Sequence, residues 1–66
     1  MQIGKNVEKF RKAKGLTQQE LADRVYVTQA AISYLEKDIK IPRFEVLARI
    51  ADALECTTDD FRGGTS

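Results

Sequence analysis

The stretch of sequence that decides the fold runs from Thr17 to Lys37 and reads TQQELADRVYVTQAAISYLEK. It holds two short amphipathic segments that each begin with Thr-Gln. Thr17 and Glu20 have the spacing of a capping box, and Thr28 is a second favourable N-cap residue. A first helix therefore starts at Thr17 and ends near Val25, and a second starts at Thr28. Two helices joined by so short a turn must cross steeply, which is the geometry of a helix-turn-helix.

Hydrophobic spacing predicts one helix before this pair and two after it. Ile3, Val7 and Phe10 recur at spacings of four and three, which places them on one side of a helix. Pro42 disfavours helix at the residue before it, so a loop is expected after the helix-turn-helix. Apolar residues then return at helical spacing, and no alternation typical of a strand occurs. The pattern predicts a compact all-α domain of five short helices.

Length and composition narrow the class of protein. A chain of 66 residues makes one small domain, expected over residues 1–62, with residues 63–66 as a flexible C-terminal tail. It has no histidine and one cysteine, Cys56, so it lacks the commonest general base and the usual thiolate metal sites. No apolar run approaches the roughly 20 residues that span a bilayer. We therefore expect a cytoplasmic protein that is not an enzyme and has no cofactor, metal or small-molecule ligand.

The second helix of the pair exposes a polar but uncharged surface at its start. Ile32 and Leu35 are expected to face the core. The outward residues are then Thr28, Gln29, Ala30, Ser33 and Tyr34. Amide, hydroxyl and methyl groups can read base edges and thymine methyls in the major groove of double-stranded DNA, whereas a merely soluble helix favours Lys and Glu. Gln18 has the matching place at the start of the first helix, where free N–H groups can seat a phosphate.

The segment from Val7 to Phe61 resembles the helix-turn-helix family of phage Cro and repressor proteins, also called the xenobiotic-response-element family. The motifs that carry the resemblance are GLTQQELA, VTQAAISYLE and PRFEVLARIADAL. The resemblance implies a five-helix domain of the lambda-repressor-like type in a prokaryotic cell or a phage-infected host. It also implies a transcription regulator, expected to be a repressor, that binds a pseudo-palindromic DNA operator as a homodimer. The recognition helix, residues 28–37, would lie in the major groove.

The resemblance assigns roles to individual residues. The family's glutamines at Gln18 and Gln29 contact DNA, and its arginine at Arg43 reaches toward a minor groove. A largely buried structural ion pair falls on Arg11 and Glu36. Base readout is expected from Gln29, Ala30, Ser33 and Tyr34, and phosphate or minor-groove contacts from Thr17, Gln18, Thr28, Lys40 and Arg43.

Two residues depart from the family pattern near the recognition helix. Tyr26 stands in the turn where the family usually has Gly, and a positive φ there would cost on the order of 1 kcal/mol. Its phenol is either a phosphate contact or simply an exposed, tolerated turn residue. Asp38 stands where the family often has Gly or Asn, with its charge at the unfavourable C-terminal end of the helix dipole.

The loop after the recognition helix carries apolar side chains where many relatives have Lys or Arg. Ile39 and Ile41 are interpreted either as residues that fold back on the core or as subunit contacts. The possible dimer contacts are Ile39, Ile41, Leu54 and Phe61. An alternative function is an antitoxin or adaptor module that uses the same fold mainly to bind another protein.

Overall fold

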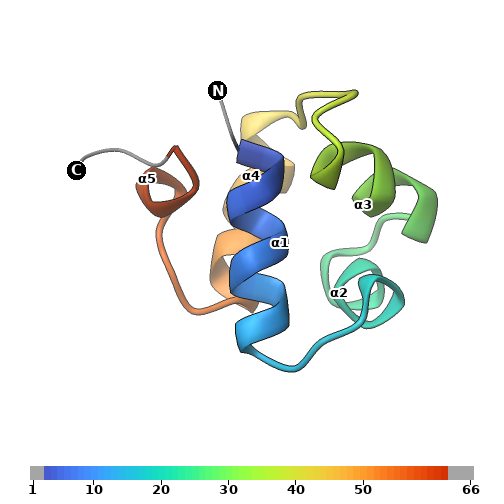
Figure 1. Cartoon of the computed structure of the whole chain (residues 1–66), viewed down its shortest axis with the longest axis horizontal. Coiled ribbons are helices and arrows are strands. Elements are labelled where there is room, and N and C mark those ends of the chain that lie inside the picture. Colours follow the sequence, from blue (N-terminus) through green and yellow to red (C-terminus); the bar gives the residue numbers. More distant parts are fainter. Residues whose placement is uncertain (1–2, 63–66) are drawn as a thin grey trace.

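Five α-helices and no strand make up residues 3–62, the part of the chain that this computed structural model describes (Figure 1). The helices are α1 (Ile3–Ala13), α2 (Gln18–Val25), α3 (Gln29–Glu36), α4 (Phe44–Ala53) and α5 (Thr58–Phe61). The all-α class and the helix-turn-helix pair, α2 and α3, are confirmed. The expected tail at residues 63–66 lies outside the described residues.

Threonine caps set the starts of α2 and α3. The Thr17 hydroxyl accepts a hydrogen bond from the Glu20 N–H over 3.0 Å, and the Thr17 N–H donates to Glu20 Oε1 over 2.8 Å. The Thr28 hydroxyl accepts from the Ala31 N–H over 3.1 Å. Each bond satisfies a backbone group that has no partner within its own helix. Both predicted helix starts, and the capping box at Thr17, are confirmed.

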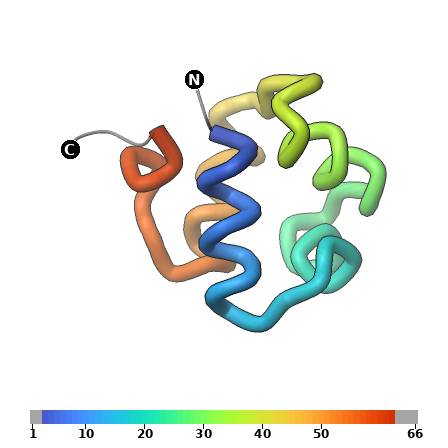
Figure 2. Tube along the Cα trace, viewed as in Figure 1, coloured from blue at the N-terminus to red at the C-terminus, as the bar shows by residue number. Residues whose placement is uncertain are grey.

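Helix α1 runs between α5 on one side and the α2–α3 pair on the other, with α4 behind it in the view of Figures 1 and 2. Helix α2 packs against α3 and α4, and α1 packs against α3 and α5. The segment that joins α4 to α5 therefore lies across α1 from α3 (Figure 1). Within residues 3–62, no helix is both long enough and apolar enough to cross a membrane.

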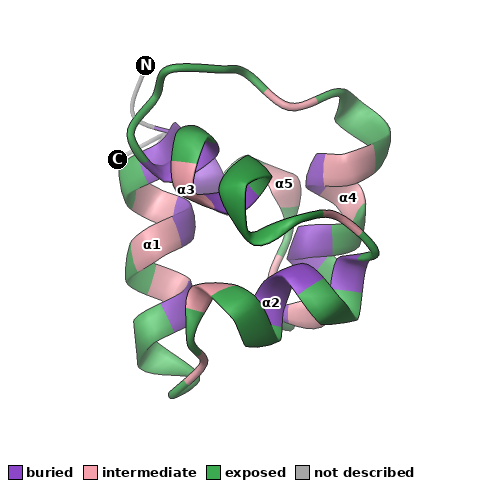
Figure 3. Ribbon diagram, turned by 90° about the vertical axis from the view of Figure 1, so that its right-hand side faces the viewer, coloured by how far each residue is buried: buried purple, intermediate pink, exposed green. Residues whose placement is uncertain are grey.

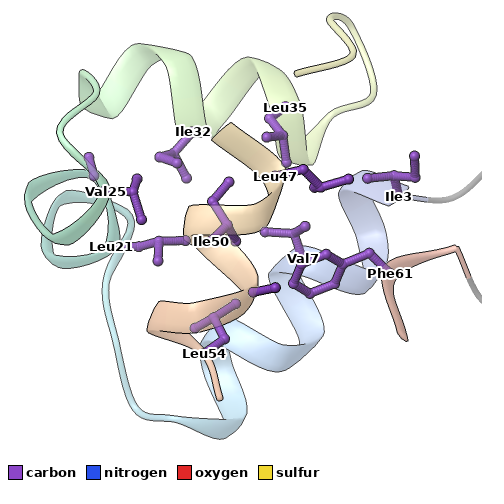
Figure 4. Close-up of a cluster of buried hydrophobic side chains, with 12 residues drawn as sticks. Ile3, Val7, Leu21, Val25, Ile32, Leu35, Leu47, Ile50, Leu54 and Phe61 are labelled. Carbon is purple, nitrogen blue, oxygen red and sulfur yellow. The ribbon is translucent and has the colours of Figure 1, made fainter. Parts of the chain in front are cut away.

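The core lies where α1, α2, α3, α4 and α5 face one another (Figure 4). Leu21, Ile32 and Ile50 are fully buried at its centre, and burying each such side chain stabilises the fold by about 1.5–3 kcal/mol. Phe61 anchors α5 by meeting the ring of Phe10 edge-on, with 5.7 Å between ring centroids. The apolar spacing read from the sequence thus marks the residues that hold the five helices together.

Leu54 and Phe61 belong to this core rather than to a subunit interface. Their exposed fractions are 2% and 0%. Their side chains already pack inside one copy of the domain, so they are not available to a second copy. The prediction that these two residues make dimer contacts is wrong.

The start of α1 is pinned to the end of α3. A Cβ atom on Gly4 would lie 2.2 Å from the carbonyl oxygen of Leu35, so only glycine fits at this crossing. Asp38 follows α3 in the left-handed region, with φ of 58°, and its Oδ1 accepts a hydrogen bond from the Gly4 N–H over 2.9 Å. The Asp38 carboxylate therefore lies at the N-terminus of α1, where the helix dipole favours a negative charge. This contact offsets its unfavourable position after α3.

Candidate nucleic-acid interface

The turn between α2 and α3 is tight and contains a strained residue. Tyr26 caps α2 in the left-handed region, with φ of 63° and ψ of 41°, and its N–H donates to the Ala22 carbonyl. Ala22 is fully buried where the two helices meet. The turn therefore keeps the conformation for which the family uses glycine, at a cost of about 1–2 kcal/mol for a residue with a Cβ atom. Tyr26 is 85% exposed, so core packing does not compensate for the strain.

The outward face of α3 carries the four residues predicted to read bases. Gln29 and Ala30 are exposed in the first turn, Ser33 is half-buried one turn later, and Tyr34 is 47% exposed. Figure 3 shows this face of α3 together with the turn that precedes it. The four positions share one side of the helix because residues three and four apart are neighbours on its surface. None of them is charged, and the apolar residues Ile32 and Leu35 point the other way into the core.

The two residues at the start of α2 differ in exposure. Thr17 is exposed, whereas Gln18 is half-buried. The Gln18 side chain donates from Nε2 to Glu36 Oε1 over 3.0 Å. Gln18 therefore does not simply face outward beside the cap, since one of its amide N–H groups already has a partner. The sequence contained no sign of this contact, because the two residues are 18 positions apart.

The predicted ion pair between α1 and α3 is confirmed. Arg11 donates from Nε to Glu36 Oε2 over 2.6 Å and from Nη2 to Glu36 Oε1 over 3.1 Å. Its Nη1 donates to the Leu16 carbonyl over 2.7 Å, so all three guanidinium nitrogens are used. The hydrogen bonds to Glu36 raise the pKa of Arg11, because they stabilise its charged form more than burial destabilises it. This pair holds the recognition helix against α1.

The loop between α3 and α4 mixes basic and apolar side chains. Lys40 and Arg43 are exposed. Ile39 and Ile41 are 62% and 79% exposed, so neither folds back on the core, and Phe44 adds a third apolar side chain that is 68% exposed. A groove of about 360 Å³ separates this loop from α3. It is lined on the two sides by residues that include Ala30, Tyr34, Ile41 and Pro42.

Phe44 is the exposed apolar residue that sequence reasoning did not single out. It opens α4 two positions after Pro42 and three residues before the buried Leu47.

Two further titratable groups, the Glu55 carboxylate and the Cys56 thiol, are influenced by their surroundings. Lys14 donates to Glu55, which ties the end of α1 to the end of α4 and lowers the pKa of Glu55. Burial raises the pKa of the Cys56 thiol, and the charge of Asp60 adds to the effect, so the thiol is not activated as a nucleophile. Within residues 3–62, no cluster of three or more His, Cys, Asp and Glu side chains could hold a metal ion.

A family model described as helix-turn-helix matches residues 7–61, which is most of the chain. The chain therefore belongs to this helix-turn-helix family, the Cro and repressor type that its motifs resemble. The match spans both capped helices, the turn at Tyr26 and the loop that leads into α4.

Known relatives and solved structures agree with this membership. The chain is 33% identical over 64 residues to the HTH-type transcriptional activator BcrR of Enterococcus faecalis, covering 97% of this chain and 31% of BcrR. It is 34% identical over 64 residues to YqaE of Bacillus subtilis, an uncharacterized HTH-type transcriptional regulator, covering 97% of this chain and 55% of YqaE. The chain thus spans less than two thirds of either relative.

Among solved structures, the P22 c2 repressor in complex with a synthetic operator is similar over nearly its whole length. The TM-score is 0.87, the sequence identity is 30%, and the match covers 92% of each chain. The SinR regulator in complex with DNA has a TM-score of 0.85 at 24% identity, covering 91% of this chain and 97% of that one, which is a likeness of fold.

Proposed function

We propose that the protein is a transcription regulator that binds double-stranded DNA in a sequence-specific way, with α3 in the major groove. Family membership supports this proposal, as do the names of BcrR and YqaE, which are HTH-type transcriptional proteins. The P22 c2 repressor, which shares the fold at 30% identity, is bound to an operator. The proposal concerns the described domain, because the chain spans only part of BcrR and of YqaE.

The observation that carries the proposal is the outward face of α3. It presents an amide, a methyl, a hydroxyl and a phenol on one side of a helix whose other side is anchored in the core. These groups match the hydrogen-bond donors, acceptors and thymine methyls of base-pair edges. We assign base readout to Gln29, Ala30, Ser33 and Tyr34. We assign phosphate or minor-groove contacts to Thr17, Gln18, Thr28, Lys40 and Arg43, which position the domain without reading sequence.

We further propose that the protein acts as a homodimer through the exposed apolar loop. Ile39, Ile41 and Phe44 are all more than half exposed and lie close together in the chain, and exposed apolar side chains that gather in one place mark protein interaction sites. A second copy placed against this loop would bury them. A dimer of this class sets its recognition helices about 34 Å apart, so that they enter successive major grooves of a pseudo-palindromic operator.

We propose repression as the mode of regulation. Occupation of promoter DNA by a dimer is enough to exclude other proteins from it, and it requires no residue beyond those of the interface. The relative BcrR is named an activator, but the chain covers only 31% of it.

A second candidate function follows from the same apolar loop. An antitoxin or adaptor would use Ile39, Ile41 and Phe44 to bind a different protein, and DNA contact would be secondary. The groove between the loop and α3 supports this candidate because it extends the apolar surface. The two functions differ in whether the purified chain alone selects a DNA sequence.

The experiment that tests the proposal is selection of bound duplexes from a random-sequence pool, with purified protein at a stated moderate salt concentration. Enrichment of an inverted repeat, with half-sites about one helical turn apart, supports a dimeric operator-binding regulator. Enrichment of a single half-site supports DNA readout without the dimer. No enrichment by a sample with a cooperative unfolding transition contradicts the proposal and favours the protein-binding module.

A further inference from the structure

The Gln18 side chain links the surface at the start of α2 to the buried ion pair. Gln18 is the first residue of α2 and is half-buried, whereas Arg11 and Glu36 are only 7% and 6% exposed. Glu36 Oε1 accepts hydrogen bonds from both Arg11 Nη2 and Gln18 Nε2, over 3.1 and 3.0 Å. The Gln18 side chain, which belongs to the proposed DNA surface, is therefore held by Glu36 at the C-terminal end of the recognition helix.

The carboxylate of Glu36 also determines which way the Gln18 amide is turned. An ionised carboxylate only accepts hydrogen bonds, so the NH₂ group of Gln18, and not its carbonyl oxygen, must face Glu36. The amide has two N–H donors, and Glu36 occupies one of them. The second N–H and the carbonyl oxygen remain available to other groups.

We propose that Glu36 is a positioning residue for DNA binding, which fixes the carboxamide of Gln18 so that its second N–H is ready to donate to a backbone phosphate. This proposal rests on the proposed function, in which Gln18 contacts phosphate. A free glutamine side chain loses rotamer freedom when it is immobilised at an interface. Because Glu36 already orders the side chain in the free protein, that loss does not oppose binding. The expected gain in affinity is about threefold to tenfold.

The test compares the contribution of Gln18 to DNA binding with and without the ion pair. The double substitution Arg11→Met/Glu36→Met replaces the buried pair by apolar side chains, which often leaves folding intact, whereas loss of Glu36 alone strands a buried charge. Where the methionine pair does not give a cooperative unfolding transition, Arg11→Leu/Glu36→Leu takes its place. Affinity for a mixed-sequence duplex at low salt is measured for four proteins: wild type, Gln18→Ala, the double variant, and the two combined.

If Glu36 positions Gln18, Gln18→Ala weakens binding about threefold to tenfold in the wild type and less than twofold in the double variant. An equal factor in both backgrounds would overturn the proposal, because Glu36 would then act only by holding α1 against α3. The neighbouring Gln19→Ala is the matched control. Gln19 donates to Asp23 over 2.8 Å and does not touch the ion pair, so its effect on binding should be the same in both backgrounds.

A measurement on the DNA-free protein separates this proposal from the proposed function. In the wild type, nuclear magnetic resonance should show the Gln18 side-chain amide protons displaced from the positions of a free glutamine, with slowed exchange of the bonded one. In the double variant they should move to the positions of a free glutamine. Free-glutamine resonances in the wild type would overturn the positioning role alone. A held amide without binding to any duplex would overturn the proposed function, and the positioning role with it.

Discussion

Gln29 is exposed in the first turn of α3, next to the Thr28 cap, and its carboxamide is proposed to read base edges. Gln29→Ala should weaken binding to the selected site by about 1–3 kcal/mol, because a glutamine can bond an adenine at two positions. Binding to a mixed-sequence duplex should barely change, since phosphate contacts supply it. Titration of both duplexes at one salt concentration checks this. An equal loss on the two duplexes would show that Gln29 does not read bases.

Tyr26 has a backbone conformation that costs free energy whatever its ring does. Tyr26→Gly should raise the free energy of unfolding by about 0.5–1 kcal/mol. Glycine adopts the left-handed region without strain, which stabilises the folded state. Its greater freedom in the unfolded chain offsets part of this gain. Urea unfolding of the two proteins measures the difference. Gly15→Ala is a control for which the opposite change in stability is expected. Gly15 has φ of 74° and no atom within 4 Å of an added Cβ, so only backbone strain should lower the stability, by about 1 kcal/mol.

Single residues divide into those that sequence could predict and those it could not. Thr17, Thr28 and the core positions follow from local spacing, because a cap and an apolar stripe are properties of one helix. The bond from Gln18 to Glu36 depends on how two helices pack, so no local pattern indicates it. Leu54 and Phe61 were predicted as possible dimer contacts, because the sequence does not tell whether an apolar residue packs in its own chain or against a second copy.

At the scale of helices, the crossing of α1 and α3 depends on a residue without a side chain. Gly4→Ala should lower the free energy of unfolding by about 1–3 kcal/mol, since the added Cβ would meet the Leu35 carbonyl, a backbone atom that cannot turn away. Thermal or urea unfolding measures the change. Lys5→Ala, an exposed substitution on the same turn, should change stability by less than about 0.5 kcal/mol. Equal effects of the two substitutions would show that α1 shifts freely over α3.

The order and type of the helices were predictable because α1 to α4 each have an apolar face, and α2, α3 and α5 each begin at a threonine cap. Their mutual arrangement was predictable only at α2 and α3, where the short turn leaves little choice. The contact between Gly4 and Asp38 joins residues 34 positions apart, and it reverses the expected effect of the Asp38 charge. Such contacts depend on the path of the loop after α3, about which the sequence contains only the position of Pro42.

At the scale of the whole molecule, the apolar loop predicts association between copies. Ile41→Ser should weaken dimerisation by about 1.5 kcal/mol or more. The proposed dimer buries the isoleucine side chain, and serine forfeits the free energy gained when that apolar surface leaves water. The fold should be unaffected, since the side chain is 79% exposed in one copy. Sedimentation equilibrium at several protein concentrations measures the dimer constant. Tyr26→Gly removes an exposed aromatic side chain from the turn between α2 and α3, so it should leave the dimer constant unchanged. A change in the dimer constant of this variant would place the interface at that turn.

Electrostatics at this scale distinguishes DNA contacts from merely solvated charges. The net charge of the chain is only +1, so affinity must depend on a few well-placed cations rather than on overall attraction. Each phosphate that the protein neutralises contributes about 0.9 to the slope of log affinity against log salt. Arg43→Ala should therefore lower the affinity and reduce that slope by about 0.9 per copy bound. Its side chain makes no cap hydrogen bond at the start of α4, so the helix should persist.

The control for Arg43 is a cation of the helix that follows it, one that already has an acidic partner. Arg49 lies 3.6 Å from Glu45 in an exposed pair on α4. Arg49→Ala should leave the slope within error of the wild type, because this arginine is assigned no phosphate. A slope that responds to Arg49 and not to Arg43 would place α4, rather than the loop before it, against the DNA. Such a result would require the domain to bind in a different orientation, with α3 no longer parallel to the groove that it is proposed to read.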